Sequence, residues 1–507
     1  MLRHLIGVGL SAGTLIFVVP SSLSAAQPFS PAIPRTWDHE ALRDLELPLA
    51  GSNKSPSHIT PEYYYAQKVR PIYASYPVYH PDREPAGYFE SLKTKEPVVL
   101  WDDRKTTPKL DAEADWIAAG ELVFDSPIDF QEMTPAQREK RAKEIRILPY
   151  RVTPSGQVPF YRYVVREKGK VELGVLSCAE CHTRVMSDGS IIKGAQGNPP
   201  FDKQFAGEIR AAAADSARAD QRVLFAAPWL DQSVISRLDK MSPDEIAAQH
   251  DAIPPGVLAR HGSGGFTPVQ IPDLIGATER RYWDHTGLQR NRGLGDLMRY
   301  AALNQGADLV SDFSGFIPIG DPKTGRPDPA TLNRYGEDQL YALALYIKNL
   351  RPPPNPNPFN ELARRGKAIF EEQECARCHD PAQGYTNNKL AVAPGFVVPP
   401  DHPARADIML NREVGTDPTL ATKTRRGTGL YKVPSLLGVW YRGFFEHNGS
   451  CATLEDWFDP RRLDDTYVPT GWKGPPGTKT RAVKGHDFGL DLNDADRKAL
   501  IAFLRTL

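Results

Sequence analysis

Residues 176–185 read LSCAECHTRV, and the central Cys-x-x-Cys-His pattern returns as QECARCHDPA at residues 373–382. The two copies consist of four cysteines and two histidines, namely Cys178, Cys181 and His182, then Cys375, Cys378 and His379. Two thiols three positions apart can each add to one vinyl group of a haem, and the adjacent imidazole can bind the iron. The duplicated pattern therefore predicts two covalently attached haems c.

A single copy of this pattern has two other interpretations, a zinc site and a redox-active dithiol. A zinc site needs a second pair of ligands, and a redox dithiol does not require a histidine directly after it. Four of the five cysteines lie in the two motifs. The fifth, Cys451, is expected to be a small buried residue without a bond. Haem attachment is the favoured interpretation.

Composition excludes one class of partner. The 507 residues carry 62 Lys and Arg against 62 Asp and Glu, so the net charge is zero. A balanced chain has no electrostatic bias toward nucleic acid, and none is expected as a partner. With 40% hydrophobic residues, the chain is long enough to form more than one core.

The first 26 residues have the pattern of a secretory signal peptide. Arg3 precedes an apolar run over residues 5–19, and small residues end near Ala26. The run is too short and too rich in glycine for a membrane span, although an uncleaved anchor is the alternative. We therefore expect an exported, periplasmic protein that does not associate with the membrane after cleavage, which agrees with haem attachment outside the cytoplasm.

Composition changes along the chain predict the domain organisation. A proline-rich segment, RPPPNPNP, cannot continue a helix. It directly follows the amphipathic stretch EDQLYALALYIKNL, and the chain ends with a second such stretch, ADRKALIAFLRTL. The predicted parts are a signal peptide (1–26), a Tyr- and Pro-rich N-terminal extension (27–105), a first haem domain (106–350), a linker (351–358) and a second haem domain (359–507). The extension is expected to be ordered but mostly irregular.

The two haem domains share short matching segments. The matched pairs are Gly120 and Gly366, Phe124 and Phe370, Pro272 and Pro434, Gly276 and Gly438, His285 and His447, and Gly287 and Gly449. An insertion of about fifty residues separates Phe124 from the first motif. We predict a mainly α protein with two cytochrome c-like helical domains in tandem. His285 and His447 are expected to serve the fold, with a ligand role as the alternative.

Whether each haem acts as an electron carrier or as a catalyst depends on what occupies the second axial position of its iron. For the second haem the candidates are His486, just before the last helical stretch, and Met409 as the rival. The corresponding segment of the first domain, VSDFSGFIPIGDP, holds no such ligand, which predicts an open iron on His182. Four other residues could still close that iron, namely Met241, His250, His261 and Met298.

From about residue 110 onward the chain resembles the bacterial di-haem cytochrome c peroxidase superfamily. The resemblance rests on the two motifs and on the segment YKVPSLLGVWYRGFFEHNGS. It implies two cytochrome c-like domains, with one haem reducing peroxide and the other supplying electrons. Where such peroxidases place a methionine ligand, this chain has Leu430. The GHDFG segment around His486 instead resembles the di-haem rubber oxygenases, although rubber is not assigned as the substrate.

The sequence thus predicts an oxidoreductase that activates hydrogen peroxide or dioxygen at the first haem, with electrons from a soluble periplasmic donor passing through the second. Two alternatives are a pure electron carrier with two six-coordinate haems and an oxygenase of an organic substrate. No catalytic acid–base group is assigned. Relatives hold a calcium ion between the domains, but no local oxygen-ligand pattern places one here.

Overall fold

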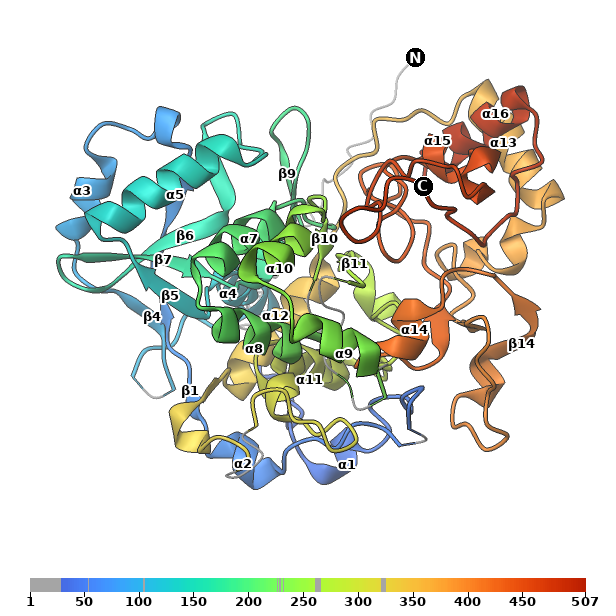
Figure 1. Cartoon of the computed structure of the whole chain (residues 1–507). Coiled ribbons are helices and arrows are strands. Elements are labelled where there is room, and N and C mark those ends of the chain that lie inside the picture. The colour runs from blue at the N-terminus through green and yellow to red at the C-terminus, as the bar shows by residue number, and fades with distance from the viewer. Residues whose placement is uncertain are drawn as a thin grey trace, which may run out of the picture.

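A computed structural model of the chain (Figure 1) describes residues 29–52, 54–103, 105–225, 227, 229–230, 232–259, 266–320 and 325–507. The predicted signal peptide and His261 lie outside the described residues.

The N-terminal extension forms short elements that pair with the rest of the chain. These are α1 (His39–Leu42), α2 (Pro61–Tyr65), β1 (Lys68–Val69), β2 (Ile72–Tyr73), β3 (Ser75–Tyr79), α3 (Tyr88–Lys93) and β4 (Val99–Trp101). Strand β1 pairs in parallel with β12 (Asn333–Arg334), and β2 pairs with β4. Trp37 and Tyr64 are buried in the same core as the helices of the predicted first haem domain. The extension therefore belongs to the body of the protein.

The first motif lies among mixed helices and strands. In chain order these are α4 (Glu113–Asp125), β5 (Asp129–Glu132), α5 (Pro135–Ile147), β6 (Gln157–Glu167), β7 (Lys170–Val175), α6 (Cys178–Cys181), β8 (Thr183–Val185), β9 (Ile191–Lys193), α7 (Phe201–Ala211), α8 (Ala214–Phe225), α9 (Gln232–Leu238), α10 (Pro243–Asp251), β10 (Val257–Leu258), β11 (Val269–Gln270), α11 (Leu294–Asn304), β12 and α12 (Glu337–Asn349).

The second motif lies among fewer elements. After the proline-rich segment come α13 (Glu361–Glu372), β13 (Leu390–Val392), β14 (Ile408–Glu413), α14 (Thr419–Lys423), β15 (Leu430–Lys432), α15 (Leu454–Trp457) and α16 (Asp494–Leu504). Figure 1 shows α13, α15 and α16 together at the upper right, with the C-terminus beside them. Among the described residues, no helix is long and apolar enough to cross a membrane.

The prediction of a mainly α protein is wrong. Of the described residues, 36% are helical and 15% are in strands, which form six small sheets, so the fold mixes α and β. The largest sheet has the order β3-β6-β7-β5, and it joins the insertion before the first motif to the extension (Figure 1). Val158, Phe160 and Val165 of β6 are buried in its core. β-branched and aromatic residues favour such a half-buried pleated surface. The prediction of a mainly α fold did not take this preference into account.

A glycine at the same place in each haem domain lets two helices cross closely. In the first domain α4 packs on α12, and a Cβ on Gly120 would lie 2.0 Å from the carbonyl oxygen of Ala342. In the second domain α13 packs on α16, and a Cβ on Gly366 would lie 1.9 Å from the carbonyl oxygen of Ala499. Neither position has room for a side chain. The matched glycines therefore form equivalent helix crossings.

The two matched halves also meet through reciprocal backbone hydrogen bonds. The amide of Gln270 donates to the carbonyl of His447 at 2.8 Å, and the amide of Lys432 donates to the carbonyl of His285 at 3.0 Å. Gln270 and Lys432 lie at equivalent places, two residues before the matched prolines. Each half thus gives the other the same hydrogen bond, as in a twofold contact between identical subunits.

Candidate metal centre

Each Cys-x-x-Cys-His segment forms one helical turn, which is α-helical at Cys178–Cys181 and a 3-10 turn at Cys375–Arg377. The amide of His182 donates to the carbonyl of Cys178 at 2.9 Å, and the amide of His379 donates to that of Cys375 at 2.9 Å. This turn holds both thiols of a motif close to its histidine. Among the described residues, all five cysteines are free of disulfides, so the motif thiols are available for attachment.

The imidazole of each motif histidine is fixed by a backbone carbonyl. Nδ1 of His182 donates to the carbonyl oxygen of Pro272 at 3.0 Å, and Nδ1 of His379 donates to that of Tyr385 at 3.1 Å. A carbonyl can only accept, so the proton lies on Nδ1 and the lone pair of Nε2 remains for a metal. This is the arrangement that metal-ligating histidines use.

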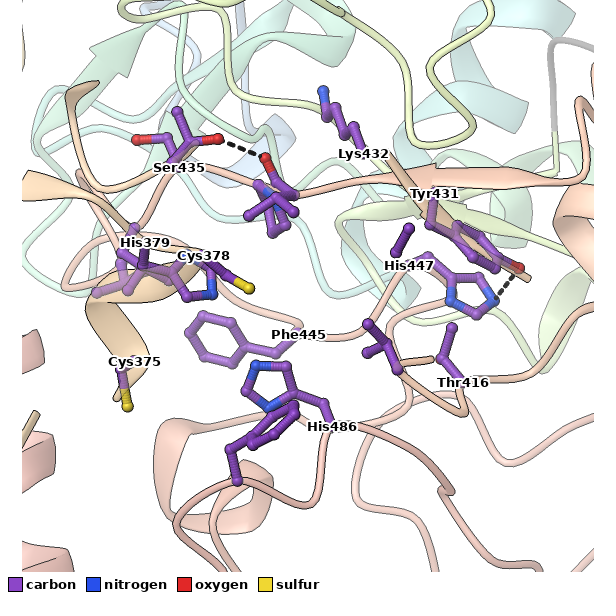
Figure 2. A pocket seen from close by; sticks show the side chains of 18 of the residues that line it. Cys375, Cys378, His379, Thr416, Tyr431, Lys432, Ser435, Phe445, His447 and His486 are labelled. Carbon is purple, nitrogen blue, oxygen red and sulfur yellow. Dashed lines mark hydrogen bonds between the residues drawn. The ribbon is translucent and has the colours of Figure 1, made fainter. Parts of the chain in front are cut away.

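His379 and His486 face each other across a cavity of about 280 Å³. Figure 2 shows the two rings pointing toward one another, with Cys375 and Cys378 on the side of His379. The ring centroids are 6.2 Å apart. A metal–imidazole bond of about 2.0–2.1 Å, plus about 1.1 Å from nitrogen to ring centre, places two ligands on opposite sides of one metal with centroids roughly 6.2–6.4 Å apart. The residues present therefore fit a haem iron between them.

The backbone holds His486 in an uncommon conformation. Its φ of 47° lies in the left-handed region, which costs a residue with a side chain about 1 kcal/mol. Three contacts fix it, since its amide donates to Val414 at 2.7 Å, Arg462 donates to its carbonyl at 2.7 Å and its ring packs on Trp457 with centroids 5.2 Å apart. Strain supported in this way is typical of functional positions.

Burial keeps the histidines neutral. Desolvation, followed by the charge of His379, lowers the pKa of His486 to about 4. Desolvation also lowers the pKa of His379, and it lowers that of His182 to about 4. All three are thus neutral imidazoles near pH 7, which is the form that binds metals.

The rival ligand and the position of the family methionine lie differently. Met409 also lines the cavity, but its sulfur accepts a hydrogen bond from the Asn387 amide at 3.4 Å. Leu430 is fully buried against Leu390 in a separate core cluster. His486 is therefore the better placed of the two ligand candidates.

Polar atoms gather beside the first motif. The Gln305 amide nitrogen donates to the sulfur of Cys178 at 3.7 Å. The Tyr335 hydroxyl and the Gln305 carbonyl oxygen are buried without a hydrogen-bond partner in the described part of the chain. The charge of Cys178 contributes to a raised pKa of Tyr335, after the larger effect of desolvation. Two polar side chains therefore lie near Cys178.

The described residues that could close the first iron separate into two groups. His250 is engaged on both ring nitrogens, by Asp202 at 2.7 Å and by Gln221 at 3.2 Å. Met241 packs in a different cluster, among α7, α8 and α10. Met298 is fully buried in the core that Cys178 contacts. Met298 is therefore the remaining candidate among the residues that the structure describes.

His285 and His447 both line the cavity, but their partners differ. Nε2 of His285 donates to the carbonyl of Gln270 at 2.8 Å. His447 forms a short buried ion pair with Glu446, which also accepts from Thr416. The pKa of Glu446 is lowered to about 2 because His447 and Thr416 outweigh desolvation. The sequence analysis missed this pair because Glu446 alone carries no motif.

No calcium site can be placed. Among the described residues, no group of three or more His, Cys, Asp or Glu side chains is arranged to hold a metal ion.

Cys451 is fully buried, and burial raises the pKa of its thiol to about 12.

Comparison with known proteins finds only distant likenesses to solved structures. No protein-family model and no curated protein matches the chain. One similar solved structure is the hydrazine synthase of Kuenenia stuttgartiensis, pressurised with xenon. It has 15% identity and a TM-score of 0.29, over 60% of this chain and 92% of that one. Another is a MauG-like protein associated with microbial copper homeostasis, with 20% identity and a TM-score of 0.22, over 34% of this chain and 56% of that one. At these TM-scores neither likeness carries an argument.

Proposed function

We propose that the chain is an exported oxidoreductase with two covalently attached haems c, one on each Cys-x-x-Cys-His segment. The observation that carries this proposal is the cavity in which His379 and His486 face each other 6.2 Å apart, beside Cys375 and Cys378. Cys178, Cys181 and His182 would hold the first haem on a helical turn of their own. Export follows from the leader pattern of residues 1–26.

The two centres would have different roles. A haem supplies one-electron redox chemistry and, where its iron has an open position, a site for peroxide or dioxygen. His379 and His486 together leave no open position, which suits electron relay. His182 has a fixed Nδ1 proton, and VSDFSGFIPIGDP, the segment that corresponds to the one around His486, holds no histidine or methionine. We therefore assign oxidant activation to the His182 centre, with a soluble periplasmic protein as electron donor.

Side chains near the first motif can handle a proton. Tyr335 is buried, and its hydroxyl and the Gln305 carbonyl oxygen have no hydrogen-bond partner in the described part of the chain. They could hydrogen-bond an oxygen-containing ligand there and hold a proton during its reduction. A Tyr335→Phe variant should therefore turn over peroxide more slowly while its cyanide affinity is unchanged.

A second candidate function is electron transfer alone. The buried Met298 lies in the core that Cys178 contacts, and its thioether could close the iron on His182. Such a protein would carry two six-coordinate haems. It would neither bind cyanide quickly nor turn over peroxide.

Optical and EPR spectra of the oxidised protein, with and without cyanide, separate the two candidates. One high-spin haem that cyanide converts, and that the His182→Ala variant lacks, would support the enzyme. The matched His379→Ala variant should instead lose the cyanide-insensitive low-spin signal. Two low-spin haems that do not bind cyanide, even after partial reduction, would contradict the proposal that the His182 centre activates an oxidant.

A further inference from the structure

The cavity between His379 and His486 extends to a group of cations at the contact between the two haem domains. Arg280, Lys432 and Arg442 line the same cavity as the two histidines. Arg280 comes from the first domain and the other two come from the second. One cavity therefore joins the predicted iron ligands to positive charge from both halves of the chain.

The two arginines occupy equivalent places in the repeat. Arg280 follows Pro272 by eight residues, and Arg442 follows Pro434 by eight. Arg280 donates to the carbonyl of Asp273 at 2.5 Å, and Arg442 donates to the equivalent carbonyl of Ser435 at 2.8 Å. Each half thus contributes one arginine held by its own backbone turn.

The acids that line the cavity do not balance these cations. Glu446 is paired with His447, and Glu374 is paired with Arg377 at 2.7 Å. Asp273 remains, and its carboxylate already accepts from the Tyr441 hydroxyl at 2.7 Å and from the Ile275 amide at 3.0 Å.

The contacts of the cations with acids are weak. The closest contact of Arg442 with Asp273 is long, at 3.9 Å, and Nε of Arg442 is buried without a hydrogen bond in the described chain. Asp284 lies near Lys432 but is shared with Arg426. Lys389 and Arg412 line the cavity as well, with Lys389 3.7 Å from Asp407 and Arg412 over the ring of Phe488. Arg280, Arg442 and Lys432 share the one remaining lining carboxylate, so positive charge is in excess there.

Uncompensated buried charge is costly, and the ionisation of these groups reflects that cost. Desolvation is the largest cause that lowers the pKa of Lys432, to about 7, and Arg280 lowers it further. Desolvation also lowers the pKa of Arg280. Anions arriving in the cavity would remove this penalty.

We propose that Arg280, Arg442 and Lys432 form a site for two carboxylates, and that these are the propionates of the haem attached to Cys375 and Cys378. The inference rests on the proposed function, because it requires a haem at the second motif. The excess of positive charge suits the two carboxylates that a haem c carries. The first domain thereby holds the cofactor of the second.

The test is a redox titration of the full-length holoprotein. Positive charge near a haem stabilises its reduced form, so Arg280→Gln and Arg442→Gln should each lower the midpoint potential of the low-spin haem. We expect about a tenfold change in the redox equilibrium, which is about 59 mV for one electron. Arg280→Lys keeps the charge and should keep most of the potential. Arg365→Gln, an exposed residue paired with Asp496, is the matched control and should change nothing.

Resonance Raman spectra of the same variants provide the second readout. The propionate bending modes of the haem should shift in both glutamine variants and stay unchanged in the control. Unchanged potentials and unchanged propionate modes, in variants with two haems and a normal low-spin signal, would overturn the inference. If Arg280→Gln fails to fold, Arg442→Gln and Lys432→Met test the same site.

A free dicarboxylate is the other source of the same chemistry. If extensive dialysis raises the wild-type potential and added malonate lowers it again, with the propionate modes unchanged, the assignment to propionates is wrong. A purified protein with fewer than two haems would instead overturn the proposed function. The two failures are therefore distinguishable.

Discussion

Replacing His486 tests both its role as an iron ligand and the strain in its backbone. His486→Ala and His486→Gly both remove the imidazole that faces His379 at 6.2 Å. One of the two haems should then change from low spin to high spin, and the number of haems that bind cyanide should rise by one. Added imidazole should restore the low-spin signal, because it can occupy the vacated position.

The two variants should differ in stability. Alanine keeps the unfavourable left-handed conformation at φ 47°, whereas glycine adopts it without steric cost. The glycine variant should therefore be more stable than the alanine variant by about 1 kcal/mol in urea unfolding. Equal stabilities would show that the surrounding contacts do not hold a strained backbone.

The spectra of these variants need a control for general damage near the haem, and Met409→Leu provides it. Met409 lines the same cavity, and leucine has a similar volume. This variant should keep the wild-type spectrum. If Met409→Leu opens the haem and the His486 variants do not, the ligand assignment is wrong.

Two further predictions concern packing and pH. Gly120→Ala and Gly366→Ala should each destabilise the protein by at least about 1–3 kcal/mol, because the new methyl group would meet a helix carbonyl within 2.0 Å. Gly207→Ala in α7 is the matched control, since a Cβ there meets nothing within 4 Å and should stabilise by about 0.4–1 kcal/mol. Because the pKa of Glu446 is lowered to about 2, its charge stabilises the fold above about pH 4.5 and is lost as the pH falls toward 2. Glu446→Gln should remove about 3 kcal/mol of that acid-dependent loss in urea unfolding curves taken from pH 6 to pH 2, and an unchanged curve would contradict the ion pair.

Local spacing allowed part of this protein to be predicted. The two motifs, the glycines of the helix crossings and the repeated proline segments are all short patterns, and the structure gives each pair equivalent backbone contacts. The largest sheet was not predicted because it joins β3 of the extension to β6 of the insertion, and such distant pairing leaves no local period.

The cation site could have been found from the sequence. Arg280 and Arg442 have the same spacing from their prolines as the other matched residues. Extending the internal alignment by a few positions would have paired them. The uncompensated charge, in contrast, depends on which acids are already engaged. That depends on contacts such as Tyr441 with Asp273, which are 168 residues apart.

The crossed hydrogen bonds of Gln270 and Lys432 have a consequence for how such a chain could arise. A contact made twice in the same way is self-complementary, so a single ancestral unit could have paired with a copy of itself before gene fusion joined the two. After fusion, the two sides of the contact no longer need to have the same sequence. The matched histidines show the resulting divergence, since His285 donates to a backbone carbonyl whereas His447 pairs with a carboxylate.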